Sequence, residues 1–409
     1  MNKVMLEKYA RLIVKSGINL QKGQILVISA PVSCAFFTRK IAEIAYKEGA
    51  KDVVMNWRDD LFSRVRYLYA PEEVFEEFPE WRKEFYVGYA RQGAAFLTIE
   101  DDDPEVMKDV NPERIMKYTR ATQTAVKEYR DRLMTNKNPW CIAAIPSPAW
   151  AKMVFPDVSE DESVEKLWQE IFKTVKADTE DPVAAWEEHK ANLKKSLDFM
   201  NTNSFKELHF KNSLGTDLRV ELPEGHIWLG GSDYTTEGLE FIANMPTEEV
   251  FTLPKKTGVN GKVVSSKPLS YNGTLIDNFS ITFKDGRIVD YTAEKGYEAL
   301  KSIIETDDGA RYLGEVALVP YDSPISQSGI LFYNTLFDEN ASCHLAIGKA
   351  YPKCIKDDDK MTKEELESLG VNDSFTHVDF MVGSRDLEIT GITPDGKKVP
   401  VFRNGNFAY

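Results

Sequence analysis

The chain has 409 residues, of which 42% are hydrophobic, and its 51 Lys and Arg against 65 Asp and Glu give a formal net charge of −14. This composition excludes a disordered, collagenous or coiled-coil protein, and the acidic balance argues against a nucleic-acid-binding protein, which needs a basic surface. No apolar run approaches the roughly 18 residues that span a membrane, and the four scattered cysteines form no disulfide scaffold, so we expect a cytoplasmic protein with reduced thiols.

The N-terminal part alternates between helix and strand patterns. Continuous apolar runs are typical of strands buried on both faces, and strand, helix, strand in this order predicts a right-handed crossover in a parallel sheet. The turn after the first strand has no glycine, which argues against a dinucleotide site. The predicted elements are helices over residues 6–14 and 36–46 and strands over residues 24–30, 52–57, 94–99 and 140–145.

Residues 162–203 form a charged stretch that Asp181-Pro182 divides into two predicted helices. From about residue 205 the apolar period changes to two, which is typical of strands. We therefore expect an α/β domain with a mainly parallel sheet over residues 1–190 and an α+β, strand-rich domain over residues 191–409. In the second domain we predict a helix over residues 294–305 and hairpins at 207–210 with 217–221, 281–283 with 287–290, and 389–391 with 399–401.

His377 and Asp379 lie in a strand-like run over residues 375–382. Residues i and i+2 of a strand share a face, so the imidazole and the carboxylate should project together. Such a pair can bind a divalent cation. Taken alone, however, the pair is better explained as a structural hydrogen bond, because buried polar groups usually find such partners.

Other acidic and imidazole side chains extend this pair. Glu315 lies inside an apolar strand, where a lone carboxylate must face water, pair with another group or bind a metal. Glu249 follows Glu248 in an acidic pair between two prolines, and Glu339 precedes His344 by five residues. As a set with His377 and Asp379, these residues favour a metal site.

Several other residues have simpler explanations. We expect His189 to be solvated on a charged helix, His209 to lie in a hairpin and His226 in a turn, none with a second ligand at useful spacing. Cys343 is interpreted as a small core residue. The aromatic residues of segments 62–69, 75–78 and 81–89 are expected mainly on buried helix faces.

The sequence resembles the aminopeptidase T / aminopeptidase S family of metalloaminopeptidases. The resemblance rests on four segments in order, NMPTEEVFTLP, RYLGEVALVP, FDENASCHLAIGKAY and THVDFMVG, and covers nearly the whole chain. It implies a two-metal exopeptidase, usually dimeric, that removes N-terminal residues from peptides with a free N-terminus. The metal ligands that it implies are Glu249, Glu315, His344, His377 and Asp379, with Glu339 and Tyr351 close to the metals.

The charges and ligand types suggest two divalent cations. Four carboxylates, from Glu249, Glu315, Glu339 and Asp379, would balance them, and nitrogen and oxygen ligands without thiolate suit zinc, cobalt, manganese or magnesium. Glu315 is the candidate bridge between the metals because of its enclosed setting. Glu339 could bind the second metal or act as general base, and Tyr351 could donate to the oxyanion or bind metal.

Two other functions are compatible with the same residues. A dinuclear hydrolase acting on a non-peptide bond such as a phosphate ester would want a cation nearby, and Lys349 and Arg311 are available. A non-catalytic protein stabilised by metal would lose thermal stability on chelation without having any turnover.

Overall fold

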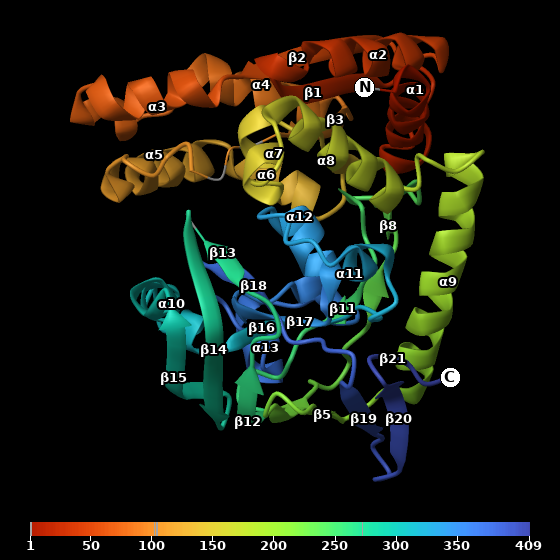
Figure 1. The fold of residues 1–409 in the computed structure, drawn as a ribbon, viewed down its shortest axis with the longest axis vertical. Coiled ribbons are helices and arrows are strands. Elements are labelled where there is room, and N and C mark those ends of the chain that lie inside the picture. Colours follow the sequence, from red (N-terminus) through yellow and green to blue (C-terminus); the bar gives the residue numbers. More distant parts are fainter. Residues whose placement is uncertain (1, 102, 104, 272) are drawn as a thin grey trace. The chain divides into compact units, whose positions relative to one another are not determined.

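The computed structural model describes residues 2–101, 103, 105–271 and 273–409, and the chain divides into two compact units (Figure 1). Unit 1 comprises Met1–Glu188 and Ser232–Pro246, and unit 2 comprises His189–Gly231 and Thr247–Tyr409. The chain therefore passes from unit 1 to unit 2 inside one long helix, and a short excursion returns it to unit 1 before the second half of unit 2.

Unit 1 is built on a five-stranded parallel sheet, as the sequence predicts. The apolar run over residues 24–30 becomes a central strand, and its burial on both sides explains why the run is continuous rather than alternating. The strand order is β10-β4-β3-β1-β2. The strands are β1 (Ile25–Pro31), β2 (Asp52–Arg58), β3 (Ala95–Glu100), β4 (Trp140–Ala144) and β10 (Asn244–Met245), with a separate small pair, β8 (Asp233–Tyr234) and β9 (Glu240–Phe241).

The helices of unit 1 include all those predicted from periodicity. Asn2 caps the first helix by accepting hydrogen bonds from the N–H groups of Val4 and Met5. Proline at the first position of the long helix supports the predicted break at Asp181-Pro182. The helices are α1 (Lys3–Leu12), α2 (Ala35–Lys47), α3 (Asp60–Tyr69), α4 (Glu80–Arg91), α5 (Pro112–Ala125), α6 (Lys127–Met134), α7 (Pro148–Val154), α8 (Glu160–Thr174) and α9 (Pro182–Asn203), of which α9 continues into unit 2.

The aromatic segments of unit 1 differ from the expectation of buried helix faces. Phe75 is fully buried, but α3 has no buried residue, and Phe62, Tyr69 and Trp81 are exposed. The aromatic side chains of these helices thus occupy both faces, and periodicity alone could not assign them to a core.

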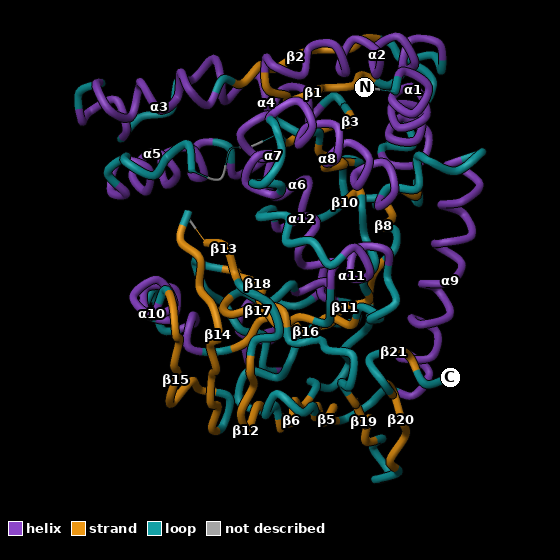
Figure 2. Tube along the Cα trace, viewed as in Figure 1, coloured by secondary structure: helices purple, strands orange, loops and turns teal. Residues whose placement is uncertain are grey.

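Unit 2 is rich in strands, as predicted, and Figure 2 shows the strands of its larger sheet side by side. The three predicted hairpins are present. Glu294, however, belongs to a strand rather than to the predicted helix, which begins after Gly296. The strands of this sheet are β5 (Glu207–Lys211), β6 (Asp217–Glu221), β12 (Val259–Val264), β13 (Leu269–Tyr271), β14 (Thr274–Lys284), β15 (Arg287–Lys295), β19 (Glu388–Ile392), β20 (Lys398–Arg403) and β21 (Asn406–Phe407).

A second sheet of unit 2 has five antiparallel strands in the order β18-β17-β16-β11-β7. Every residue of the central strand β16 and of its neighbour β17 is buried. The strands are β7 (Leu229–Gly230), β11 (Val250–Thr252), β16 (Leu313–Leu318), β17 (His344–Gly348) and β18 (His377–Met381), and the helices of this half are α10 (Tyr297–Ile304), α11 (Pro324–Ser328), α12 (Thr335–Asp338) and α13 (Lys363–Leu369).

The apolar sides of the two sheets of unit 2 share one core with α10. Leu300, Ile303 and Ile304 of α10 are fully buried in it, at the spacing that places side chains on one helix face. In the part of the chain that the structure describes, no helix is both long and apolar enough to cross a lipid bilayer.

Candidate metal centre

The register of the smaller sheet gathers acidic and imidazole side chains on one face. Glu315 of β16 lies opposite Ala346 of β17, and Ala346 lies opposite Asp379 of β18. His344 precedes Ala346 by two residues, and His377 precedes Asp379 by two, so all of them share this face. Four candidate ligands from three segments of sequence thus stand on three neighbouring strands.

Small residues on the middle strand leave space between these side chains. Ala346 stands between Glu315 and Asp379, and Gly348 lies opposite His377. On this face of the sheet, neither Ala346 nor Gly348 carries more than a methyl group, so the carboxylates and imidazoles around them can approach a common point. The space above Ala346 and Gly348 therefore lies among the candidate ligands.

Glu249 reaches the cluster from the residue before β11. In the ladder, Val250 lies opposite Gly230 of β7. A Cβ atom on Gly230 would lie 2.3 Å from the carbonyl oxygen of Glu249, and the φ angle of Gly230 is +149°. Both facts require glycine at this position, because any side chain would push the backbone of Glu249 away.

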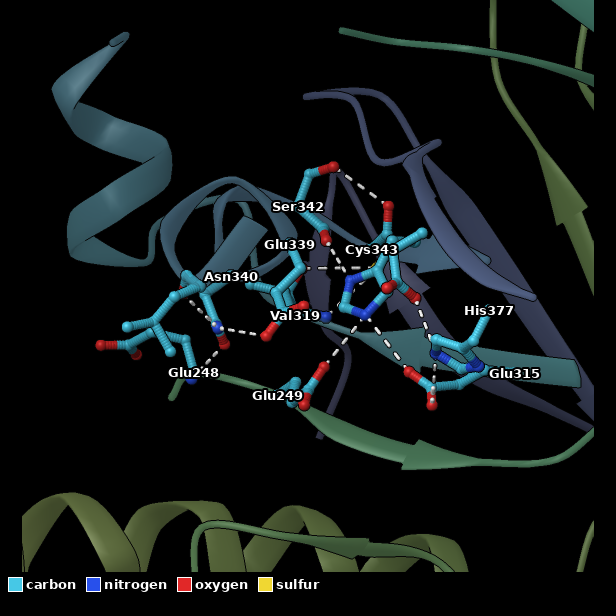
Figure 3. A network of polar contacts seen from close by, with 12 residues as sticks. Glu248, Glu249, Glu315, Val319, Glu339, Asn340, Ser342, Cys343 and His377 are labelled. Carbon is cyan, nitrogen blue, oxygen red and sulfur yellow. Dashed lines mark hydrogen bonds and ion pairs between the residues drawn. The ribbon is translucent and has the colours of Figure 1, made fainter. Parts of the chain in front are cut away.

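The five side chains form two groups that share Glu315 (Figure 3). Nε2 of His344 lies 3.0 Å from Oε2 of Glu249 and 3.4 Å from Oε1 of Glu315. Nε2 of His377 lies 3.8 Å from Oε2 of Glu315 and 3.3 Å from Oδ1 of Asp379. Glu315 therefore directs one carboxylate oxygen toward each histidine, and within each group the candidate ligand atoms lie within 4.8 Å of one another.

Both histidines are oriented by backbone carbonyl groups. Nδ1 of His344 donates to the carbonyl oxygen of Ser342 at 3.1 Å, and Nδ1 of His377 donates to that of Lys349 at 2.7 Å. A carbonyl oxygen can only accept, so each Nδ1 carries the proton. In the neutral imidazole this leaves the lone pair on Nε2, directed at the carboxylates, which is the arrangement of a metal-ligating histidine.

Two buried carboxylate oxygens of the cluster indicate that a cation would fit there. Oε2 of Glu249 and Oδ1 of Asp379 are inaccessible to solvent, and the groups facing them are Nε2 of His344 and Nε2 of His377, which donate no hydrogen bond while the imidazoles are neutral with the proton on Nδ1. Buried carboxylate oxygens without hydrogen bonds are costly unless a cation balances them. Carboxylate oxygens and imidazole nitrogens are suitable ligands for a divalent metal ion, so the residues fit the group.

Burial and the neighbouring carboxylates also shift the pKa values of the cluster. Burial lowers the pKa of His344, but Glu249 and Glu315 outweigh that effect and raise it well above the ordinary value. For His377, burial again lowers the pKa, yet Asp379 and Glu315 raise it to about 10. Burial also raises the pKa of Glu315. The carboxylates thus create a strongly negative potential that attracts positive charge.

Glu339 and Tyr351 stand at the border of the cluster rather than in either group. Burial and the nearby charges of Glu249 and Asp379 raise the pKa of Glu339 well above its ordinary value. Burial and the charge of Glu315 likewise raise the pKa of Tyr351, whose ring centroid lies 4.9 Å from that of His377. The phenol group of Tyr351 thus lies beside the cluster, where it can donate a hydrogen bond.

Asn340 links the loops that carry Glu249 and Glu339. Its side-chain oxygen accepts a hydrogen bond from the N–H of Glu248 at 2.7 Å, and its amide donates to Glu339 Oε1 at 3.4 Å and to the carbonyl oxygen of Leu336 at 3.0 Å. Asn340 is fully buried. It therefore fixes the spacing of two acidic segments that are far apart in the sequence.

His189 corrects an expectation, because it is not a solvated residue of α9. Its side chain is only 11% exposed, its Nε2 donates to the carbonyl oxygen of Thr247 at 2.8 Å, and it lies 3.7 Å from Oε2 of Glu248. The carboxylate of Glu248 points away from Glu249 (Figure 3). His189 thus supports the acidic loop from behind, while Cys343 is buried in the core as expected.

Sequence reasoning missed the supporting residues of the cluster. Asn340 and Ala346 lie inside a recognised motif, but their importance depends on partners in other segments. Gly230 lies in no motif. Glycine is needed there because the backbone of Glu249 lies against it, and residues 232–246, which separate the two in sequence, belong to unit 1. The adjacency of Asn340 to the acidic Glu339 was the one available signal, and it did not reveal the bond to Glu248.

Comparisons with known proteins agree with this geometry. The sequence profile of the thermophilic metalloprotease (M29) family matches residues 2–407. Aminopeptidase 2 of Geobacillus stearothermophilus is 50% identical over 404 residues, covering 99% of this chain and 98% of that protein. Aminopeptidase T of Thermus thermophilus is 40% identical over 402 residues, covering 98% of both. The solved structure of wild-type AmpT from Thermus thermophilus superposes with a TM-score of 0.92 at 39% identity, covering 99% of each chain.

Proposed function

Since this chain belongs to the thermophilic metalloprotease (M29) family, we propose that it holds two divalent cations around Glu315 and uses them to hydrolyse the N-terminal residue from peptides. The chain is a metal-dependent aminopeptidase, and thus a hydrolase acting as an exopeptidase. The number of ions and the residue roles below are our proposals.

The shared position of Glu315 carries the proposal of two cations. Its Oε1 faces His344 and its Oε2 faces His377, so one carboxylate can serve both groups. Glu249 and His344 would complete one site, and His377 and Asp379 the other. The four carboxylates would balance two divalent cations, and zinc, cobalt, manganese and magnesium are the candidate metals.

Bound cations would supply a water of lowered pKa and would polarise the carbonyl group of the scissile bond. The chain's own residues would supply the proton transfers and the orientation. Glu339, whose pKa is raised, is suited to take a proton from the attacking water and return it to the leaving amine. Tyr351, whose ring lies beside that of His377, is suited to donate a hydrogen bond to the oxyanion.

The requirement for a free N-terminus follows from the chemistry of the amine. A free α-amine could bind a cation through its lone pair or pair with a nearby carboxylate, whereas the amide nitrogen of an acetylated N-terminus can do neither. The alternative of a phosphate ester substrate receives no support from Arg311, which lies 3.8 Å from Glu305 in an ion pair. We further propose that the protein is a cytoplasmic homodimer. Gel filtration with light scattering would test the dimer.

The decisive experiment is a digest of a peptide library by protein stripped of metal and then reloaded with zinc, cobalt, manganese or magnesium. Release of the first residue from free but not N-acetylated peptides, restored by metal, supports the proposal. Glu315→Gln should remove most activity, and His377→Ala should lower the metal content per chain measured by elemental analysis. Full activity in Glu315→Gln would contradict the bridging role.

A further inference from the structure

A pocket in unit 2 begins at the metal cluster. Its lining includes Glu339 and Asp379, which border or belong to the cluster, and Leu269 and Met381, which are buried apolar residues. The other lining residues are neutral or acidic: Ser270, Tyr333, Asn334, Thr335 and Asp338. The pocket therefore joins the proposed reaction centre to a wall of mixed apolar and neutral polar character.

The outer wall of this pocket is held in place by a buried carboxylate. Oδ1 of Asp338 accepts a hydrogen bond from the N–H of Phe332 at 2.7 Å, and Oδ2 accepts one from that of Asn334 at 3.0 Å. The residue between them, Tyr333, has a left-handed φ of +56°. Asn334 in turn caps α12 through the N–H of Leu336 at 3.0 Å. Such a doubly bonded turn keeps a fixed shape and can discriminate between ligands.

The described lining of the pocket offers no cationic side chain. Asp338, Glu339 and Asp379 are acidic, Glu339 and Asp379 lie at the proposed metal site, and the described lining residues include no Lys, Arg or His. Lys267 influences Asp338 electrostatically but is not among the lining residues. An acidic group that enters the pocket beyond the metal site would lose water without gaining a cationic side chain as partner, and it would approach the carboxyl group of Asp338. A neutral group avoids both costs.

We propose that this pocket receives the side chain of the substrate's N-terminal residue and that it selects neutral, mainly apolar side chains against acidic ones. This inference rests on the proposed aminopeptidase function. The side chain of the first residue leaves the chain one bond away from the reacting carbonyl carbon, so it must lie beside the cluster. Leu269 and Met381 offer it apolar contact there, while Ser270 and Thr335 offer hydroxyl groups.

The test compares peptides that differ only in charge at the first residue, with N-terminal Gln against Glu and with Leu as a reference. The metal-loaded wild-type protein should cleave the Gln peptide with a kcat/KM at least about tenfold higher than the Glu peptide. Thr335→Lys should lower this ratio about tenfold or more by supplying a cationic partner, and Ser270→Lys gives an independent second position. Ser302→Lys, on the exposed face of α10, is the matched control.

Each outcome is decisive once folding and metal content are verified for every variant. A Gln-to-Glu ratio near one in the wild type, or the same ratio in both pocket variants as in Ser302→Lys, would overturn the assignment. The assignment would also be overturned if the preference for a neutral side chain applied to the second residue of the peptide and not to the first. The pocket would then hold the part of the peptide that leaves after cleavage. Failure to cleave any peptide would instead refute the proposed function, and this inference with it.

Discussion

Asn340 holds the backbone of Glu248 through a 2.7 Å hydrogen bond between the Glu248 N–H and the asparagine side-chain oxygen. Because the neighbouring residues in the two loops are Glu249 and Glu339, this one bond sets the distance between two acidic side chains of the proposed metal site. A buried amide that also bonds two other acceptors has little freedom to move, so the spacing is built into the fold.

We predict that Asn340→Leu weakens metal binding about 10–100-fold, as is usual when a group that orients a ligand is lost. It should also destabilise the fold by about 1–3 kcal/mol, because buried partners lose their hydrogen bonds. Asn138→Leu in unit 1 is the matched control: that asparagine is equally buried and bonds the carbonyl oxygens of Ala90 and Ala94. Titration of metal into stripped protein should separate the two variants, and equal metal affinities in them would refute the role of Asn340.

Ala346 should be sensitive to side-chain size because it stands between Glu315 and Asp379 on neighbouring strands. Ala346→Leu is expected to occupy the space between the carboxylates and to remove at least one metal ion per chain. Some destabilisation, about 1–3 kcal/mol, should accompany the overpacking. Ala346→Gly keeps the space open, so its metal content by elemental analysis should match the wild type. A metal-replete Ala346→Leu protein would show that the ions do not bind there.

Gly230→Ala should displace Glu249, since the added methyl group would lie 2.3 Å from the glutamate's carbonyl oxygen. The expected result is a large loss of activity together with a lower melting temperature. Gly396→Ala serves as a control for backbone strain alone, because Gly396 also has a positive φ, +86°, but nothing lies near its missing Cβ. If both substitutions lower the melting temperature equally and leave activity intact, the close approach at Glu249 does not matter.

The thiols should react slowly at mildly alkaline pH. Burial raises the pKa of Cys34 to about 12, with a further contribution from the charge of Asp101, and burial raises that of Cys343 to about 12. A raised pKa keeps each sulfur protonated at about pH 8, and the thiolate is the reactive species. We expect an aromatic disulfide reagent to label the native protein far more slowly than the protein unfolded in guanidinium, where all four cysteines become accessible. Rapid labelling of native Cys34 would contradict this expectation.

Local signals in the sequence were enough to predict the regular elements. The hairpin of β14 and β15 turns at Asp285 and Gly286, which both have positive φ angles, as the Asp-Gly pair indicates. The strands β7, β10 and β11 have two or three residues each, too few to show a period, and their partners are distant in sequence. Their pairing therefore depends on the fold as a whole.

The candidate site was partly predictable for a similar reason. Residue types and motif order singled out the carboxylates and histidines, because a buried charge inside an apolar strand is unusual enough to be noticed. The position of His189 against Thr247 was missed, since a histidine on a charged helix has the same sequence pattern whether it faces water or a loop. The supporting contacts depend on distances, and distances follow from packing rather than from composition.

The anchoring of both imidazoles to main-chain oxygens has a consequence for how such a centre can diversify. Peptide carbonyl groups persist through every substitution of the residues that carry them, so the donor strength and tautomer of His344 and His377 are shielded from mutation at Ser342 and Lys349. Any drift in ion preference among descendants of this chain must then arise from the acidic members, whose surroundings are made of replaceable side chains.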